Sequence, residues 1–171
     1  MTRKGFGNFV YVVLLCLLTL DANAKFTKVS IGVNGLTCSQ CSRSVEMQLR
    51  KLSFVADVTM DLANTQGVIL FKDNKKVDIS SLAKAVKDAG FSLRYLNADM
   101  DVSDVQFAES GACFSYKNDA YQIIKPLPTT DTKLKLAFVG KDYNAEKNKT
   151  KPTAANLFCK GAKAYQVEAV Q

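Results

Sequence analysis

The chain has 171 residues, a formal net charge of +7, five cysteines and no histidine, and this length suits one mid-sized domain or two small ones. Without histidine the protein lacks the commonest acid–base catalyst and the commonest imidazole ligand, so any metal must be held by sulfur or oxygen. The lysines are scattered along the sequence and no aromatic–basic motif is present, which argues against nucleic acid as a partner.

Residues 1–24 have the pattern of a secretory signal peptide. A basic start precedes an almost unbroken apolar run at 9–20, and Ala22-Asn23-Ala24 supplies the small residues that signal peptidase requires. The alternative is a membrane anchor, but the run is shorter than the roughly 20 residues of a spanning helix. We therefore expect residues 1–24 to be removed and the remaining chain to have no stable membrane insertion.

Residues 25–98 are predicted to fold as strand–helix–strand–strand–helix–strand. Apolar alternation and short apolar runs predict strands at 28–34, 55–62, 68–71 and 91–95. Helical spacing of apolar residues predicts two helices, carried by Val45, Leu49 and Leu52 and by Ile79, Leu82, Ala83 and Val86. Asp78 or Ser80 can cap the second helix, and Gly90 can end it. This order predicts an α+β fold, an antiparallel sheet with both helices on one face.

Cys38 and Cys41 stand three residues apart where the first strand gives way to the first helix. The helix dipole and the free backbone N–H groups favour thiolates at that position. Two soft thiolates suit Cu(I) or Hg(II), which accept two ligands, whereas Zn(II) usually takes four. We predict a metal site at these two cysteines, with Cu(I) favoured and Hg(II), Zn(II) or Cd(II) as alternatives. A structural disulfide and a redox dithiol are the competing interpretations.

Residues 28–97 resemble the heavy-metal-associated domain of copper chaperones, copper-ATPase tails and the periplasmic mercuric-ion carrier. The resemblance is carried by the stretches Gly35-Leu36-Thr37-Cys38-Ser39-Gln40-Cys41 and Val55-Ala56-Asp57-Val58-Thr59-Met60-Asp61-Leu62, and by Leu82, Ala85, Val86, Ala89, Gly90 and Phe91. It implies a ferredoxin-like βαββαβ fold with Cys38 and Cys41 as the metal ligands.

Three positions bear on how far this resemblance extends to the site. Leu36 stands where the family usually has methionine, a position that packs under the loop, and leucine should serve there. Thr37 stands where zinc and cadmium members often carry an aspartate ligand, so its presence favours Cu(I). Phe91 falls where family members place an aromatic residue or lysine close to the metal; it either packs in the core or shields the thiolates from water.

The C-terminal part is predicted to be different in character. Residues 99–106 are acidic and lack periodicity, which indicates a linker. Residues 107–171 are predicted to form a small, mainly β module with strands at 113–116, 121–124 and 133–139 and a closing strand within 158–170; it resembles no family known to us. A module this small needs a staple, so we predict a disulfide between Cys113 and Cys159. A second metal site at these cysteines is the weaker alternative.

The sequence therefore predicts an exported metal carrier or buffer and not an enzyme. It would hold Cu(I) between Cys38 and Cys41 and pass the ion by ligand exchange to a metal transporter or another metallochaperone. A monomer in the bacterial periplasm is expected, with secretion or the cell surface as alternatives. Two other functions stay open: a thiol–disulfide redox protein using the same cysteines, and a metal-sensing protein whose C-terminal module docks on a membrane transporter.

Overall fold

The computed structural model describes residues 25–103, 105, 107, 113–124, 132–144, 159 and 161–170. The predicted signal peptide lies outside these residues. The described elements are β1 (Lys25–Asn34), α2 (Ser39–Arg50), β2 (Val55–Asp61), β3 (Gln66–Phe71), α3 (Ile79–Asp88), β4 (Ser92–Asp101), β5 (Cys113–Tyr116), β6 (Asp119–Ile123), β7 (Lys133–Val139) and β8 (Ala164–Val170). Neither described helix is long and apolar enough to cross a membrane.

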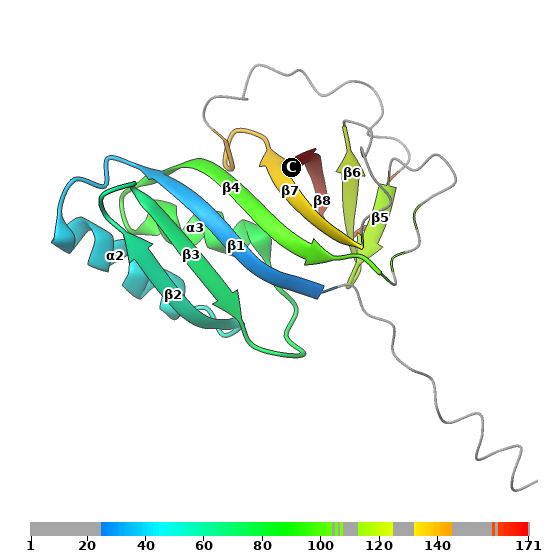
Figure 1. Ribbon diagram of the computed structural model, residues 1–171, viewed down its shortest axis with the longest axis horizontal. Coiled ribbons are helices and arrows are strands. Elements are labelled where there is room, and N and C mark those ends of the chain that lie inside the picture. The colour runs from blue at the N-terminus through cyan, green and yellow to red at the C-terminus, as the bar shows by residue number, and fades with distance from the viewer. Residues whose placement is uncertain are drawn as a thin grey trace, which may run out of the picture.

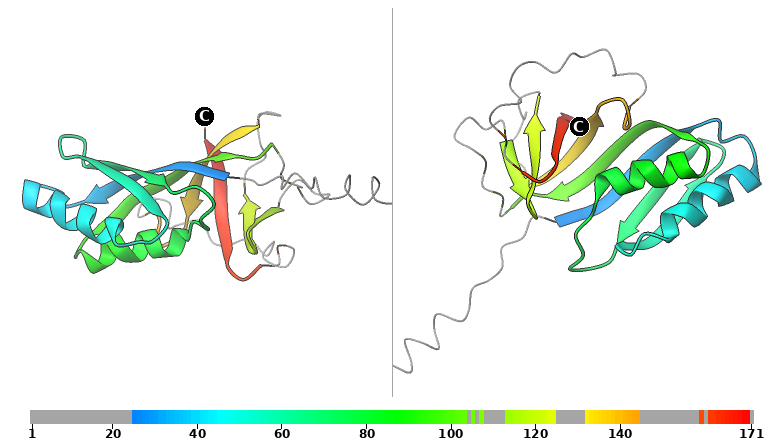
Figure 2. Two further views of the ribbon diagram at one scale, coloured as in Figure 1. Left: turned by 90° about the horizontal axis from the view of Figure 1, so that it is seen from below. Right: turned by 180° about the vertical axis from the view of Figure 1, so that it is seen from behind.

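All eight strands belong to one sheet in the order β2-β3-β1-β4-β7-β8-β6-β5 (Figure 1). The first four are antiparallel to their neighbours, and α2 and α3 lie together on one face of them (Figure 2). This is the ferredoxin-like arrangement, so the predicted fold class is confirmed. The additional strands are also present, but they extend the same sheet and do not form a separate one.

Strand β4 joins the two parts of the sheet. Its outer edge pairs with β7 from Asn97 opposite Ala137 to Asp101 opposite Lys133. Residues 99–101 thus belong to a strand, and the prediction of a linker from 99 is wrong for these three residues. Their acidic side chains alternate with buried Met100, and Asp99 also forms an ion pair with Lys28 at 3.2 Å. The acidic composition therefore concealed a strand that alternates between core and solvent.

A single hydrophobic core runs through both parts of the sheet. The ring of Phe26, near the start of β1, meets that of Tyr116 of β5 edge to face with centroids 5.0 Å apart. Tyr121 of β6 is completely buried and stacks between Phe114 and Tyr165, at 5.0 and 5.3 Å. Each such ring contributes roughly 1.5–3 kcal/mol by leaving water. The N-terminal and C-terminal parts therefore stabilise one another through shared apolar surface.

Candidate metal centre

A short anchored loop carries the predicted site from the end of β1 to the start of α2. Gly35 turns the chain with a φ of +77°, a backbone conformation that side chains with a Cβ rarely adopt. The N–H of Thr37 donates to the carbonyl of Gly35 at 3.0 Å. Leu36 is only 1% exposed, so it packs beneath the loop as the resemblance implies. Together, the turn at Gly35 and the buried side chain of Leu36 fix the position of the loop that carries the first cysteine.

Cys38 is the N-cap of α2. Its backbone is extended, and its sulfur accepts a hydrogen bond from the N–H of Cys41 at 3.1 Å. Its carbonyl accepts from the N–H of Ser42 at 3.0 Å, the first bond of the helix. A cap position normally holds serine, threonine, aspartate or asparagine because an oxygen is needed there. The Cys38 sulfur takes that role here. In the reduced protein the positive end of the helix dipole would favour a thiolate at this position.

Cys41 lies in the first turn of the same helix, partly buried against the hydrophobic core, while Cys38 is exposed. Their Cα atoms are 5.1 Å apart and their sulfur atoms lie within bonding distance. No acidic residue occupies the first turn of α2, so no carboxylate there opposes two thiolates. The structure thus brings both predicted ligands together at an open end of the fold.

The turn after α3 brings Phe91 beside this loop. The N–H of Gly90 donates to the carbonyl of Lys87 at 2.9 Å and that of Phe91 to Val86 at 3.1 Å, the paired bonds of a Schellman motif. Gly90 has a φ of +90°, as the motif requires. A Cβ built on Gly35 would lie 4.0 Å from Cδ1 of Phe91. The half-buried ring therefore packs against the core and lies beside Gly35 of the loop. Shielding of the two sulfurs from water stays a prediction.

Further protein ligands are scarce around the loop. In the part of the chain that the structure describes, no three Cys, His, Asp or Glu side chains gather in a way that could hold a metal ion. The other predicted pair, Cys113 and Cys159, lies in the C-terminal part with Cα atoms 5.8 Å apart and sulfur atoms within bonding distance. The sulfur atoms of Cys113 and Cys159 are therefore placed to bond with one another.

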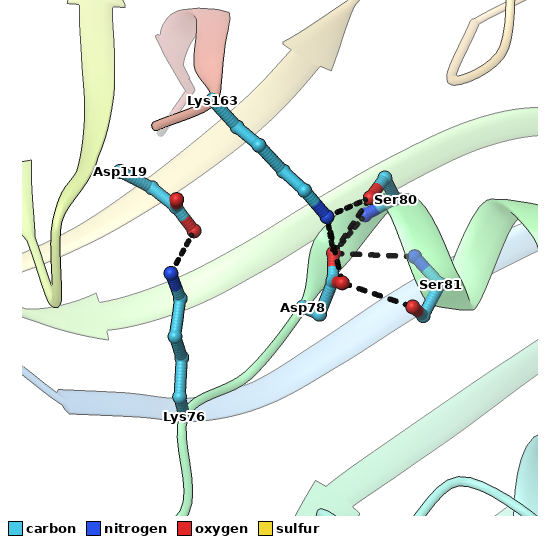
Figure 3. A network of polar contacts seen from close by, with 6 residues as sticks. All are labelled: Lys76, Asp78, Ser80, Ser81, Asp119 and Lys163. Carbon is cyan, nitrogen blue, oxygen red and sulfur yellow. Dashed lines mark hydrogen bonds and ion pairs between the residues drawn. The ribbon is translucent and has the colours of Figure 1, made fainter. Parts of the chain in front are cut away.

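A polar joint ties the start of α3 to the C-terminal strands, as Figure 3 shows. We use this name for Lys76, Asp78, Ser80, Asp119 and Lys163. The Lys163 ammonium donates to both oxygens of Asp78, at 2.8 and 2.7 Å, and to the Ser80 hydroxyl at 2.6 Å. Lys76 reaches across to Asp119 at 2.9 Å, and Asp119 is only 1% exposed. The joint thus makes two ionic contacts between the segment that leads into α3 and the C-terminal part of the chain.

Asp78 performs two tasks in this joint. It is the N-cap of α3, accepting from the N–H groups of Ser80 and Ser81 at 3.1 and 3.3 Å, and it is the ion-pair partner of Lys163. Burial alone would raise the pKa of Asp78, but the bonds from Lys163, Ser80 and Ser81 outweigh it and hold the pKa well below its usual range. The same contact raises the pKa of Lys163.

Two members of the joint, Asp78 and Ser80, were predicted from the sequence as alternative caps of α3, and the structure makes Asp78 the cap. Asp78 was detectable as a helix cap because a capping residue precedes an apolar helical pattern. Asp119 and Lys163 gave no signal, since their partners lie 43 and 85 residues away in the chain. A cap that also binds a distant lysine looks, in one sequence, the same as an ordinary cap.

The ferredoxin-like fold, with two cysteines three residues apart at the start of its first helix, defines the class of domain to which this chain belongs. The model of the family described as the heavy-metal-associated domain matches residues 30–92. The mercuric transport protein periplasmic component of Serratia marcescens is 33% identical over 63 residues, 37% of this chain and 68% of that protein. The chain belongs to the heavy-metal-associated domain family, and the resemblance seen in the sequence is confirmed.

Other similar proteins are longer or match more loosely. Copper-transporting ATPase 1 of Rhizobium meliloti is 34% identical over 86 residues, which are 50% of this chain and 10% of the ATPase. The crystal structure of oxidized MerP from Ralstonia metallidurans CH34 is 32% identical, with a TM-score of 0.36 over 42% of this chain and 97% of that one. The chain thus spans about a tenth of the copper ATPases that it matches, and the family match ends before β5.

Proposed function

We propose that this protein is a carrier of a soft metal ion, which it holds between the thiolates of Cys38 and Cys41 and passes to a partner by ligand exchange. The observation that supports this most directly is the placement of both sulfurs at the start of α2, one capping the helix and exposed. An exposed ligand lets an incoming thiolate of the partner approach the ion before the outgoing bond breaks.

Cu(I) is the proposed cargo, with Hg(II) as the principal alternative. Copper ATPases and mercuric periplasmic components are both among the similar proteins. Two thiolates satisfy a soft ion that tolerates low coordination, whereas Zn(II) or Cd(II) would need further ligands. The chain has no histidine to supply them, and Thr37 offers no carboxylate at the loop.

The metal-loading form must carry free thiolates. With the sulfurs of Cys38 and Cys41 bonded to one another, neither has a charge to donate, so two electrons from a cellular dithiol must first convert the disulfide to two thiols. Loss of their protons to solvent then gives the metal-binding thiolates. We propose an exported, periplasmic location, which the name of the mercuric relatives and the pattern of residues 1–24 support. The partner would be a metal transporter or another metallochaperone.

The test is an anaerobic Cu(I) titration of the reduced protein against a chromophoric chelator. Stoichiometric, tight binding is expected for the natural chain. The variant Cys38→Ser, Cys41→Ser should lose it, and the matched variant Cys113→Ser, Cys159→Ser, which also lacks two sulfurs, should keep it. Retained stoichiometric binding by the first variant would disprove the proposed site.

A thiol–disulfide redox function is the second candidate. The two sulfurs of Cys38 and Cys41 lie within bonding distance, as a dithiol–disulfide couple requires. Their position at a helix N-terminus also favours it, because such a position lowers the pKa of a thiol and makes it more reactive. Reduction of insulin disulfides by the reduced protein, at a rate that Cys38→Ser abolishes, would support this function. Tight Cu(I) binding without such turnover would exclude the redox function and favour the metal carrier.

A further inference from the structure

Four lysines from three separate segments of the sequence come together where β1 begins. Lys25, Lys72, Lys75 and Lys117, which we call the basic face, line a shallow hollow of about 160 Å³. Its floor is apolar, formed by the side chains of Phe26, Phe71, Val77 and Tyr116, and its remaining lining residue is Asn74. The fold thus assembles a surface of lysine heads over aromatic rings from β1, the β3–α3 connection and the β5–β6 turn.

The charge of this face is largely uncompensated. Asp73 pairs with Lys25, and Lys117 lies over the ring of Tyr116 with its nitrogen 5.7 Å from the centroid. Within the described part of the chain, Lys72 and Lys75 have no ion-pair partner, and both are exposed. The face therefore carries a net charge of about +3, which creates a positive surface potential that attracts anions.

The basic face and the metal loop lie at opposite ends of the same strand. Lys25 is the first residue of β1 and Asn34 the last, just before the loop that carries Cys38. Ten extended residues at about 3.3 Å each separate the two ends by roughly 30 Å. Figure 1 shows this separation: the start of β1 lies beside β5 and β6, and the loop before α2 lies at the far end of the molecule.

The basic face is also close in sequence to the apolar run at 9–20. Only residues 21–24 stand between that run and Lys25, and at about 3.5 Å per residue they reach no further than roughly 18 Å. Until residues 1–24 are removed, a run that sits in a bilayer therefore holds the basic face near the lipid headgroups, where the face first meets the membrane.

We propose that the basic face binds the headgroups of anionic phospholipids and holds the protein on a membrane surface with its metal loop pointing away. Lysine ammonium groups supply the attraction, and the hollow between them admits a phosphate. The proposal is independent of which metal the loop carries. It gives four of the 23 basic residues a shared role and leaves the exposed sulfur free to meet a partner.

The test is sedimentation of the chain from Lys25 onward, which contains every described element, with phosphatidylcholine vesicles that contain or lack phosphatidylglycerol. Binding is expected only to the anionic vesicles and should weaken with salt. The variant Lys72→Gln, Lys75→Gln, Lys117→Gln should bind on the order of a hundredfold more weakly, at about fivefold per lysine. Cu(I) binding should be unchanged in it, which separates this proposal from the function of the metal loop.

A matched variant makes the test specific to this face. Lys84→Gln, Lys87→Gln, Lys141→Gln removes the same charge from another exposed surface, that of α3 and the turn after β7, and should bind nearly as well as the natural chain. Equal losses in the two triple variants would show a mere effect of net charge and overturn the proposal. So would equal binding to neutral vesicles, or binding to an acidic polymer such as heparin without binding to anionic vesicles.

Discussion

Replacing Asp78 with alanine should cost about 2 kcal/mol of folding free energy. Loss of an N-cap that accepts two backbone N–H bonds accounts for about 1 kcal/mol. The Asp78–Lys163 contact is short, but the side chains are 32% and 43% exposed, so solvent screening limits it to about 1 kcal/mol. Lys163→Met removes only the second contribution and should cost about half as much. The measurement is urea unfolding of both variants and of the double variant.

The double variant tests the reasoning most sharply. Because the two residues share one contact, their costs should not add, and the double variant should lose about 1 kcal/mol less stability than the sum of the two single losses. Additive costs would show that Lys163 and Asp78 do not interact in solution. A Lys163→Met variant as damaging as Asp78→Ala would equally refute the division into cap and ion pair.

The same contact carries a pH dependence of known sign. The pKa of Asp78 is lowered in the folded protein, so its carboxylate contributes fully above the ordinary aspartate pKa of about 4. The contribution is lost as pH falls through the folded-state pKa. The stability difference between the natural chain and Asp78→Ala should therefore be constant at neutral pH and shrink in acid. A difference that grows below about pH 4 would contradict the assignment.

Three other outcomes follow from the described contacts. Cys113→Ser, Cys159→Ser should lose up to about 4 kcal/mol of stability in calorimetry if the pair is bridged across its 46-residue separation; no loss would mean unbridged cysteines. Gly90→Ala should cost about 1 kcal/mol because φ there is +90°, and an unchanged melting temperature would argue against the Schellman turn. Burial raises the pKa of Tyr121 and Tyr143, so their phenolate absorbance should appear only as the protein unfolds in alkali, and a reversible titration of every tyrosine near pH 10 would contradict that burial.

The N-terminal elements were predictable because local pattern and tertiary role agree there. Val45 and Leu49 recur with helical spacing and are fully buried, and Gly90 ends α3 with the backbone conformation that its position suggested. Tyr95 is the exception to this agreement. Simple alternation along the strand predicts that Tyr95 lies on the same face of the sheet as Leu93. A register shift between Gly32 and Val33 makes Arg94 an extra residue, so Leu93 and Leu96 share the core face instead. Such a bulge depends on the partner strand, and one sequence does not display it.

The assembled surfaces were not predictable for a related reason. The lysines of the basic face come from three separate segments of the chain and resemble ordinary solubilising charge in the sequence, yet they line one hollow. Asp119 gave no sign of being buried, since its counter-ion Lys76 lies far back in the chain, in the connection between β3 and α3. The two cysteines of the loop were predictable because three-residue spacing at a helix start is local geometry. Features made by long-range pairing need the fold.

The C-terminal part also protects an edge of the sheet in the N-terminal part. In an isolated β2-β3-β1-β4 sheet, β4 would present unpaired N–H and C=O groups, a template for aggregation. Here β7 pairs with it through Asp101, and the edge moves to β5. The opposite edge strand, β2, has a register irregularity between Val55 and Asp57 and carries exposed carboxylates at Asp57 and Asp61, which discourage further pairing.

A truncation after Met100 would therefore do more than remove a docking module. It would expose the β4 edge and the apolar surface that Phe26 shares with Tyr116, and it would leave Asp78 without Lys163. These contacts hold the start of α3, and the turn after that helix carries Phe91 beside Gly35. We therefore expect the truncation to disturb the cysteine loop through the helix. The structural role of the C-terminal strands has to be separated from any role in partner binding by point variants of exposed residues on these strands, which should leave the sheet intact.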